Sequence, residues 1–511
     1  MEIISSKAGV ILLRSFSTVS SLILVSRALG YIRDMLIASY IGPGAMTDAF
    51  FLAFRLPNTF RRIFAEGAFN AAFVPIFTKI WHRHPKAAAL FVSNTLVFLS
   101  LVLVGLSILF EIFMPQVMAI IAMGFSKNQT FDLVVHLGRI MFPYIIFISL
   151  ASLFMSVLNS LNKFAVTSAS SIILNISAIL SLTLFFTSPL QAVFSLSWSI
   201  PISGILQLSL VGFVAHKHLK ISLFKPRWTP TIKRLFQKIL PGIYGAGIYQ
   251  INLLTSDIIA SFIPSGISYL SFADRINQFP LGLIGASMGL VVLPELSRYI
   301  SQNNAAEALK TMNKGIIGAL YLAIPCAFGI FTLAPNIVQS LFKYGHFTAA
   351  DVTATSLCLK AFIIGLPAFV LVKVLTNAYF ARGDTHTPMI LTSFILGTNI
   401  VINIVLAYFY SYVGIAVGTS IAYWLQVVVL ITLLKKNQWF QLTKSLQNKI
   451  LACIVSAFIM MLALVLMRKS DYLAIIPIHQ LQTAILIGLG VAIYLAASQL
   501  MGLNLKRLRT G

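Results

Sequence analysis

A chain of 511 residues has room for about three soluble domains of average length. The composition excludes soluble domains, because 58% of the residues are hydrophobic and only 10% are charged, whereas soluble proteins carry about 25% charged residues. Basic residues collect in the cytoplasmic loops of membrane proteins, so the net charge of +24 indicates a polytopic membrane protein and no nucleic-acid partner.

Membrane-spanning helices account for most of the chain. A helix needs about 20 predominantly apolar residues to cross a bilayer, and we find about fourteen such windows. The sequence lacks the alternating segments of about ten residues that build membrane β-barrels, so we predict an all-α protein. In chain order, the expected helices lie near 10–38, 46–78, 88–113, 133–158, 167–187, 191–214, 237–263, 268–298, 315–335, 351–379, 388–410, 414–434, 450–467 and 479–502.

The distribution of lysine and arginine predicts the orientation of these helices. With the N-terminus in the cytoplasm, 23 of the 37 basic residues fall in cytoplasmic segments and only four in outside loops. Such a bias is typical of the true topology, because cytoplasmic loops are enriched in Lys and Arg. We therefore expect both termini in the cytoplasm.

An internal repeat predicts how the helices are grouped. Residues 36–58 (LIASYIGPGAMTDAFFLAFRLPN) resemble residues 258–280 (IIASFIPSGISYLSFADRINQFP), with six identical positions. An even number of predicted helices separates the copies, so both have the same orientation, which predicts two parallel six-helix lobes around a central cavity. The expected parts are a first lobe at 1–215, a basic cytoplasmic linker at 216–236, a second lobe at 237–435, two extra helices within 450–502 and a basic tail at 503–511.

Ionisable residues inside the predicted helices gather in three of them. A charged side chain costs at least about 2.5 kcal/mol at the centre of a bilayer, so such residues mark functional sites by default. Asp48, Arg55 and Arg62 recur every seven residues, which places them on one face of a helix. The whole cluster comprises Arg27, Arg33 and Asp34 in the first helix, Asp48, Arg55, Arg61, Arg62 and Glu66 in the second, and Asp274 and Arg275 in the eighth.

Arginine dominates this cluster, which holds six arginines and four acids. The guanidinium group binds phosphate oxygens in a bidentate way, so a positive cavity of this kind suits a substrate such as a pyrophosphate. For the interfacial members of the second helix, binding of lipid head groups is a further alternative. A purely structural interpretation is also open, in which the lobes are held together by the pairs Arg33–Asp34, Arg62–Glu66 and Asp274–Arg275.

A few other polar residues lie in or beside the predicted helices. Lys373 stands in the middle of one helix and is a candidate cavity-lining cation. Asp257, Asn377 and Asp384 offer hard oxygen ligands to a coupling ion such as Na⁺, which is the sole cofactor that the sequence suggests. The chain has no Walker A motif and no credible catalytic triad or carboxylate pair, so we expect neither an enzyme nor an ATPase motor.

Several segments carry specific motifs. The longest is SRALGYIRDMLIASYIGPGAMTDAFFLAFRLPNTFRRIFAEGAFNAAFVPIF at 26–77, which strongly resembles the MurJ/MviN lipid II flippases. The resemblance continues in SYLSFADRINQFPLGLIG (268–285), LPELSR (293–298), LFKYGHFTAAD (341–351) and YFARGDTHTP (379–388), and it is weakest after about residue 440.

This resemblance implies a fourteen-helix fold of the MOP exporter superfamily in the bacterial cytoplasmic (inner) membrane. It implies export of lipid II, the undecaprenyl-pyrophosphate-linked peptidoglycan precursor, and so a part in cell-wall biogenesis and cell shape. Expected partners are lipid II, membrane lipids and cell-wall synthesis proteins. Other MOP-type exporters, of polysaccharide lipids or drugs, and a non-transporting scaffold for wall synthesis are the alternatives.

The resemblance also points to individual residues. Functional arginines and an aspartate of the family's first two helices match Arg27, Arg33, Asp34, Asp48 and either Arg61 or Arg62, and the arginine of its eighth helix matches Arg275. One departure concerns Gln278, which stands where some members have a glutamate. An obligatory carboxylate at that position is therefore not expected here.

Overall fold

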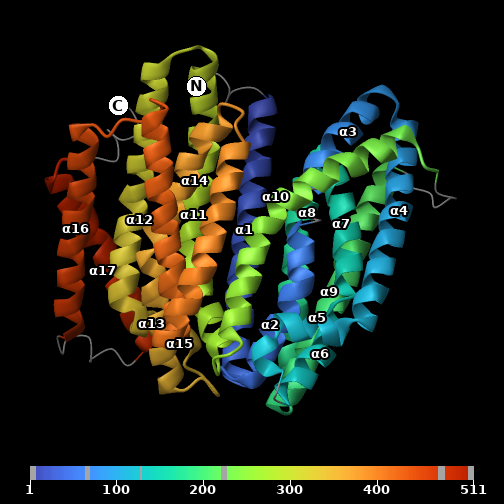
Figure 1. Ribbon diagram of the computed structural model, residues 1–511, viewed down its shortest axis with the longest axis horizontal. Helices are drawn as coiled ribbons and strands as arrows, with labels where there is room; N and C mark the ends of the chain where they lie inside the picture. The colour runs from blue at the N-terminus through green and yellow to red at the C-terminus, as the bar shows by residue number, and fades with distance from the viewer. Residues whose placement is uncertain (1–6, 64–68, 127–128, 220–226, 470–477, 504–511) are drawn as a thin grey trace. The chain divides into compact units, whose positions relative to one another are not determined.

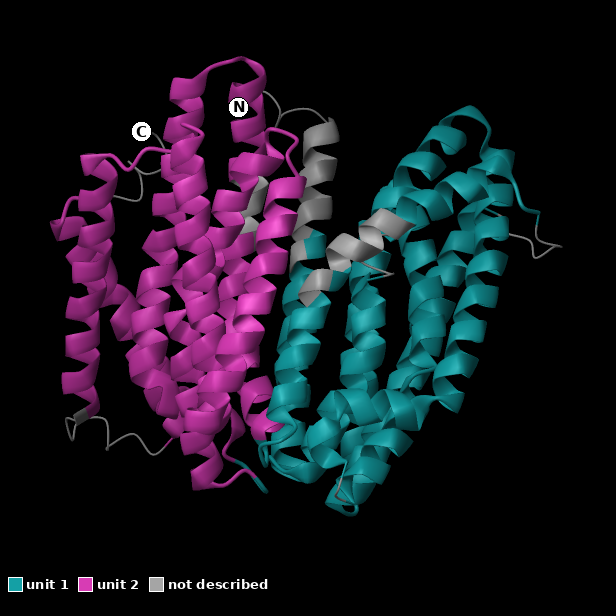
Figure 2. Ribbon diagram, viewed as in Figure 1, with its two compact units in different colours: residues 1–265, 344–346 teal, residues 266–343, 347–511 magenta. Residues whose placement is uncertain are grey.

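The computed structural model describes the chain except for residues 1–6, 64–68, 127–128, 220–226, 470–477 and 504–511 (Figure 1). Every regular element in this described part is helical, which confirms the predicted all-α class. The helices form two compact units (Figure 2). Unit 1 comprises Met1–Ser265 and Tyr344–His346, and unit 2 comprises Gly266–Lys343 and Phe347–Gly511.

Unit 1 packs long helices against one another around α7 and α9, with α8 between α1 and α9. One predicted helix, 133–158, is broken at Pro143, since proline has no N–H to donate to the preceding turn. The elements of unit 1 are α1 (Lys7–Tyr40), α2 (Ala45–Arg61), α3 (Phe69–Arg83), α4 (Pro85–Ile112), α5 (Met114–Ile121), the 3₁₀ turn η3 (Met123–Phe125), α6 (Thr130–Met141), α7 (Tyr144–Ser160), α8 (Phe164–Leu184), α9 (Pro189–Leu219) and α10 (Pro230–Ala260).

Unit 2 is built around α12, which contacts most of the other helices of the unit. The two predicted helices 388–410 and 414–434 are both present within the segment labelled α15: the backbone leaves helical geometry at Ser411, whose φ is 55°, and the second half lies against the first, as the Gln426–Thr392 hydrogen bond shows. The elements of unit 2 are α11 (Gly266–Ser301), α12 (Ala305–Phe342), α13 (Ala349–Ile364), α14 (Leu366–Phe380), α15 (His386–Lys436), α16 (Lys444–Lys469) and α17 (His479–Leu500).

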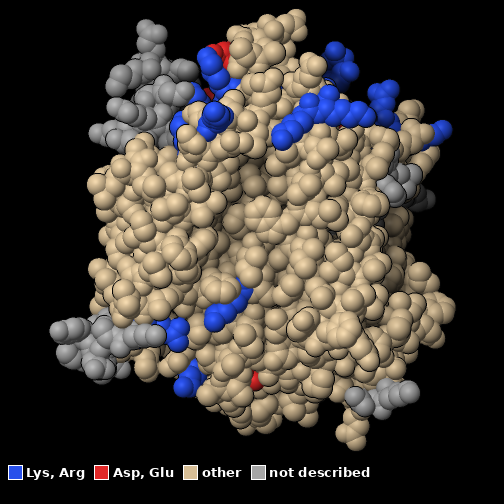
Figure 3. Space-filling view, turned by 60° about the vertical axis from the view of Figure 1, so that its left-hand side comes forward, with Lys and Arg blue, Asp and Glu red and all other residues tan. Residues whose placement is uncertain are grey.

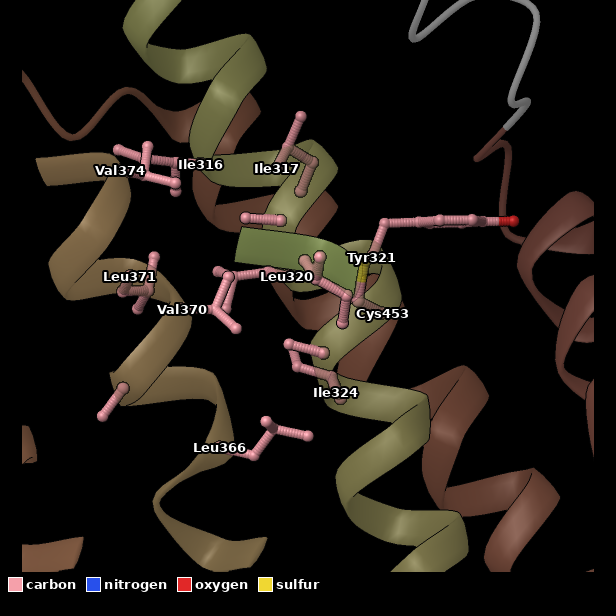
Figure 4. Packing of buried hydrophobic residues seen from close by; sticks show 14 of the residues in the cluster. Ile316, Ile317, Leu320, Tyr321, Ile324, Leu366, Val370, Leu371, Val374 and Cys453 are labelled. Carbon is pink, nitrogen blue, oxygen red and sulfur yellow. The ribbon is translucent and has the colours of Figure 1, made fainter. Parts of the chain in front are cut away.

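Branched aliphatic side chains fill the core of unit 2. Ile316, Leu320 and Ile324 of α12 pack with Leu366 and Val370 of α14, and all five are buried (Figure 4). Because lipid is as apolar as these side chains, their packing stabilises the spanning helices through close van der Waals contact. This core fixes the position of α14, the helix that carries the predicted site residues Lys373 and Asn377.

The two helices outside the predicted repeat, α16 and α17, are joined to α12 by polar contacts as well as apolar ones. The Tyr494 hydroxyl donates to the Tyr321 carbonyl at 2.8 Å, and the Tyr321 and Ser498 hydroxyls lie 3.0 Å apart. Both bonds are buried, where an unsatisfied polar group is costly, so they define the position of α17 on α12.

The surface of the described part is that of a membrane protein. Nine of its helices are long and apolar enough to span a bilayer by length and composition. Large side chains such as Leu101, Ile108 and Phe394 are more than half exposed. On the face drawn in Figure 3, a broad band lacks charged side chains, and lysines and arginines gather along one edge. Exposed apolar belts of this kind are typical of contact with lipid.

The compact units do not divide where the predicted lobes do. The second lobe was expected to begin at 237, yet α10 belongs to unit 1, because it packs against α3, α4 and α5. Unit 1 also includes Tyr344–His346, where the His346 amide donates to the Ser39 carbonyl at 2.9 Å. Gly345 permits this approach, since a Cβ there would lie 2.2 Å from the Ser39 oxygen. The division into lobes by sequence repeat remains a prediction.

Candidate functional site

A charged network on α1 involves the first of the predicted site residues. Arg33 donates through Nε and Nη2 to Oδ1 of Asp34, at 3.0 and 2.8 Å. Asp34 is buried, whereas the Arg33 side chain keeps 13% of its surface exposed. The predicted Arg33–Asp34 pair therefore exists, and the buried carboxylate holds one edge of the guanidinium in place.

Asn175 of α8 completes this network and was missed in the sequence. Its Oδ1 accepts from Arg33 Nη1 at 3.0 Å, and its Nδ2 donates to the Ser26 carbonyl at 3.0 Å. The amide thereby bridges two turns of α1 and fixes the direction in which Arg33 points. Charged side chains inside the predicted helices marked the candidate site residues, and asparagine is neutral. Only the position of this polar residue in the middle of the apolar helix 164–184 could have indicated a role.

Arg27 differs from Arg33 in being exposed. It precedes Asp34 by seven residues, so the two share a face of α1. Within the part of the chain that the structure describes, Arg27 forms no ion pair or hydrogen bond. Its full positive charge is thus available to an anion from outside the protein.

Arg55 of α2 is paired with Asp257 of α10, both in unit 1. The Arg55 guanidinium donates through Nη2 to Oδ1 at 3.1 Å and through Nε to Oδ2, which makes the contact bidentate. The two side chains are 25% and 9% exposed. Arg55 was predicted to bind substrate and Asp257 to bind an ion; both stay predictions, and in this structure the two side chains form an ion pair.

The remaining predicted residues of α2 lie at its two ends. Asp48 is buried in the first turn, where the partial positive charge of a helix N-terminus favours a carboxylate. Arg61 and Arg62 are half-buried at the other end, and Arg61 Nε donates to Asn58 Oδ1 at 3.0 Å. Glu66, the predicted partner of Arg62, lies outside the described residues.

In unit 2, α11 carries the predicted residues of the eighth spanning helix. Asp274 accepts from Gln278 Nε2 at 3.2 Å, one turn further along, and Arg275 is exposed. Lys373 of α14 lies against Gly285 of α11, because a Cβ on Gly285 would come within 2.9 Å of its Nζ. Glycine at 285 therefore gives this lysine its room beside α11.

Two of the three predicted sodium ligands have other partners. Asp257 pairs with Arg55, and Asp384 Oδ1 accepts from the amides of His386 and Thr387, at 3.1 and 2.9 Å, where α15 begins. The hydrogen bond from the Thr387 backbone N–H is the main reason that the pKa of Asp384 lies below its usual value. Asn377 is buried on α14. Among the residues that are described, no three His, Cys, Asp or Glu side chains gather as a metal site.

Comparisons with known proteins agree on one family. A family model described as lipid II flippase MurJ matches residues 37–480. A probable lipid II flippase of Rickettsia prowazekii is 38% identical over 96% of this chain and 98% of its own length. One of Vibrio cholerae is 34% identical over 98% of each chain.

Solved structures show the same relationship. A lipid II flippase MurJ in an inward closed conformation matches with a TM-score of 0.80 and 27% identity, over 94% of this chain and 98% of the other. A multidrug resistance MATE transporter of the MOP superfamily, in an inward-facing conformation, matches with a TM-score of 0.69 over 80% of this chain and 96% of its own. At 14% identity the second likeness concerns the fold alone.

Proposed function

The chain belongs to the lipid II flippase MurJ family, and from this premise we propose that it carries lipid II outward across the cytoplasmic membrane. Membership makes it a transporter and a multi-pass protein of the bacterial inner membrane. The proposed substrate combines a pyrophosphate with a sugar–peptide head group and a long lipid tail. Its pyrophosphate is the part that a cluster of arginines can recognise.

The observation that supports this role most directly is the unpaired charge of Arg27. An exposed arginine within an apolar helix has a high cost in a membrane unless it meets water or an anion. Arg27 has no protein partner in the described part of the chain, so it is the residue that we assign first to the pyrophosphate. Arg33 is held in a fixed direction by Asp34 and Asn175, which suits a second phosphate contact.

The other predicted residues are assigned lesser parts. Arg275 is exposed on α11 and is proposed to contact lipid II. Arg55 is proposed to hold α2 against α10 through its ion pair with Asp257. The remaining candidates are proposed either to contact the substrate or to support the residues that do. They are Asp34, Asp48, Arg61, Arg62, Glu66, Asp274, Gln278 and Lys373.

Export of cationic drugs is the rival function, since the MATE fold is shared. A site for cations requires acids that are not already neutralised. Two of the buried acids in unit 1, Asp34 and Asp257, are each bonded to an arginine. Their charge is therefore taken up within the protein, which favours an anionic substrate over a cation.

Reconstitution tests the function itself. Proteoliposomes that contain the purified chain and lipid II should expose lipid II on the opposite leaflet much faster than protein-free vesicles, as measured by cleavage with an added lipid II-degrading enzyme. A phospholipid of similar tail length serves as the specificity control. Equal rates for lipid II and for that control lipid would contradict the proposed substrate.

The charge bias predicts which side of the membrane the loops face. Single cysteines at the exposed positions His82 and Lys233 should resist a membrane-impermeant thiol reagent in intact cells. Lys343→Cys, in a predicted outside loop, should react readily under the same conditions. The three native cysteines are removed first. Labelling of His82→Cys from outside would reverse the proposed topology.

The charge of the cluster predicts that membrane potential drives the cycle. With Asp257 included, six arginines and five acids leave one positive charge, and a doubly charged pyrophosphate turns it into one negative charge. An inside-negative potential then favours both outward movement of the loaded site and inward return of the empty one. Each charge that crosses the full field contributes about 2.3 kcal/mol per 100 mV.

A cysteine placed beside Arg27 reports on this coupling. Leu24 is 60% exposed one turn before Arg27, and the labelling rate of Leu24→Cys in proteoliposomes should change when a potassium diffusion potential is imposed. Lys343→Cys is the control for general effects on the reagent. If the rate follows a sodium gradient at constant potential instead, coupling by Na⁺ replaces this proposal, with Asn377 and Asp384 as the first residues to test.

A further inference from the structure

A cavity of about 410 Å³ lies at one end of unit 2. Three connecting segments form it: the turn before α12, the turn after α14 and the segment after α15. Pockets that hold small ligands have volumes of about 300–1,000 Å³. The residues of its wall that matter here are Asn303, Asn304, Ala305, Ala306, Arg382 and Trp439.

Arg382 supplies the positive charge of this cavity. Its guanidinium carbon lies 4.2 Å from the centre of the Trp439 ring, and its Nη1 donates to the Ala378 carbonyl at 2.8 Å. A guanidinium has five N–H donors, so the stack and this single bond leave most of them unused. In the described part of the chain, no acid pairs with Arg382.

The nearest acids in the sequence have other partners. Asp384, two residues after Arg382, accepts from the amides of His386 and Thr387. Glu307, in the first turn of α12, is bonded to Lys310 at 2.6 Å. Neither acid is bonded to Arg382, so its guanidinium keeps most of its N–H donors for a ligand.

The N-terminus of α12 adds donors to the same cavity. The first amides of a helix have no partner within it and carry part of its dipole, and Ala305 and Ala306, the first residues of α12, line the cavity. The Asn304 side chain caps only the Glu307 amide, at 3.2 Å. A half-buried arginine with spare donors thus shares a pocket with the positive end of a 38-residue helix.

Tyr379 packs behind the Arg382–Trp439 stack. Its ring packs edge-on against Trp439, with centroids 5.6 Å apart, and its side chain is fully buried. The Tyr379 hydroxyl has no hydrogen-bond partner among the described residues. The cavity wall does not include Tyr379, so the assignment of a ligand rests on Arg382 and the start of α12.

We propose that this cavity binds a phosphate group, either of an anionic phospholipid or of a soluble phosphate. A phosphate offers several acceptor oxygens and negative charge, which match the guanidinium fork and the helix amides. Tryptophan is enriched at membrane interfaces, and basic pockets between membrane helices bind anionic head groups. The site is independent of the proposed export of lipid II, which rests on α1 and α2.

Binding to the purified full-length chain in an uncharged detergent tests this proposal. Native mass spectrometry would count bound dioctanoyl phosphatidylglycerol, with dioctanoylglycerol as the phosphate-free control. Arg382→Gln should weaken phosphatidylglycerol binding at least about tenfold, because a hydrogen bond to a charged group contributes about 1.5–3 kcal/mol. Arg298→Gln is the matched control, since Arg298 also stacks on an aromatic ring, Tyr299 at 4.8 Å, but does not line the cavity.

A second variant keeps the Arg382–Trp439 stack intact. Gln441 is an exposed residue of the cavity wall, and Gln441→Glu should weaken binding by placing a negative charge beside the phosphate. Competition by inorganic phosphate would identify a site for soluble phosphate, and binding of the phospholipid without such competition would identify a head-group site. Equal binding by the wild type and by both cavity variants, or by dioctanoylglycerol, overturns the proposal.

Discussion

Replacing Arg27 with alanine should abolish lipid II export while the protein still reaches the membrane in normal amount. The variant loses a charge that has no partner within the described protein, so the folded state loses little. The substrate, however, loses charge-assisted bonds of about 1.5–3 kcal/mol each, and two such bonds correspond to roughly a hundredfold or greater loss in rate. The measurement is the flipping rate in proteoliposomes, normalised to the amount of reconstituted protein.

Arg33→Ala is the informative comparison for this prediction. Removing Arg33 leaves the buried Asp34 carboxylate without its charge partner, so abundance and thermal stability should fall together with export. Arg27→Lys keeps the charge but not the bidentate fork and should retain partial activity. If Arg27→Ala is as unstable as Arg33→Ala, or exports lipid II at the normal rate, the proposal that Arg27 binds the pyrophosphate is wrong.

Local features of the fold were predictable from the sequence. Hydrophobic windows located the spanning helices, because a bilayer demands long apolar segments whatever the tertiary contacts are. The break at Ser411 falls between two predicted helices, 388–410 and 414–434. The short helix α5 was not expected, since eight residues are too few to give a membrane signal. The resemblance of several motifs to a known family predicted the type of fold and the function.

Pairing between distant residues was not predictable. Arg55 and Asp257 are 202 positions apart, and their contact depends on how α2 and α10 pack. Spacing along α2 placed Arg55 on one face with Asp48 and Arg62, but it did not reveal that an acid from another helix neutralises that arginine. Arg382 was likewise counted as one basic residue of a loop, because the cavity around it is made of three separate segments. Charge patterns identify candidate residues, and tertiary contacts decide which of them stay available to a substrate.

Breaking the Arg55–Asp257 pair should cost far more stability than breaking an exposed ion pair of the same protein. Arg55→Gln leaves Asp257, whose side chain is 9% exposed, without its bidentate partner, and an uncompensated buried charge typically costs about 3–5 kcal/mol. Asp257→Asn should be milder, because Arg55 is 25% exposed and can reach water. The double variant Arg55→Gln/Asp257→Asn removes both charges and should recover much of the loss of Arg55→Gln.

Thermal unfolding in detergent, followed by size-exclusion chromatography of the surviving folded protein, would compare these variants. Glu307→Gln is the matched control: it breaks the Glu307–Lys310 pair, whose side chains are 38% and 64% exposed, and such surface pairs contribute less than about 1 kcal/mol. Recovery in the double variant, together with measurable flipping, places Arg55 in the protein framework of unit 1. If Arg55→Gln instead keeps full stability and loses export, and Asp257→Asn does not restore it, then Arg55 contacts the substrate as its position on the charged face of α2 first indicated.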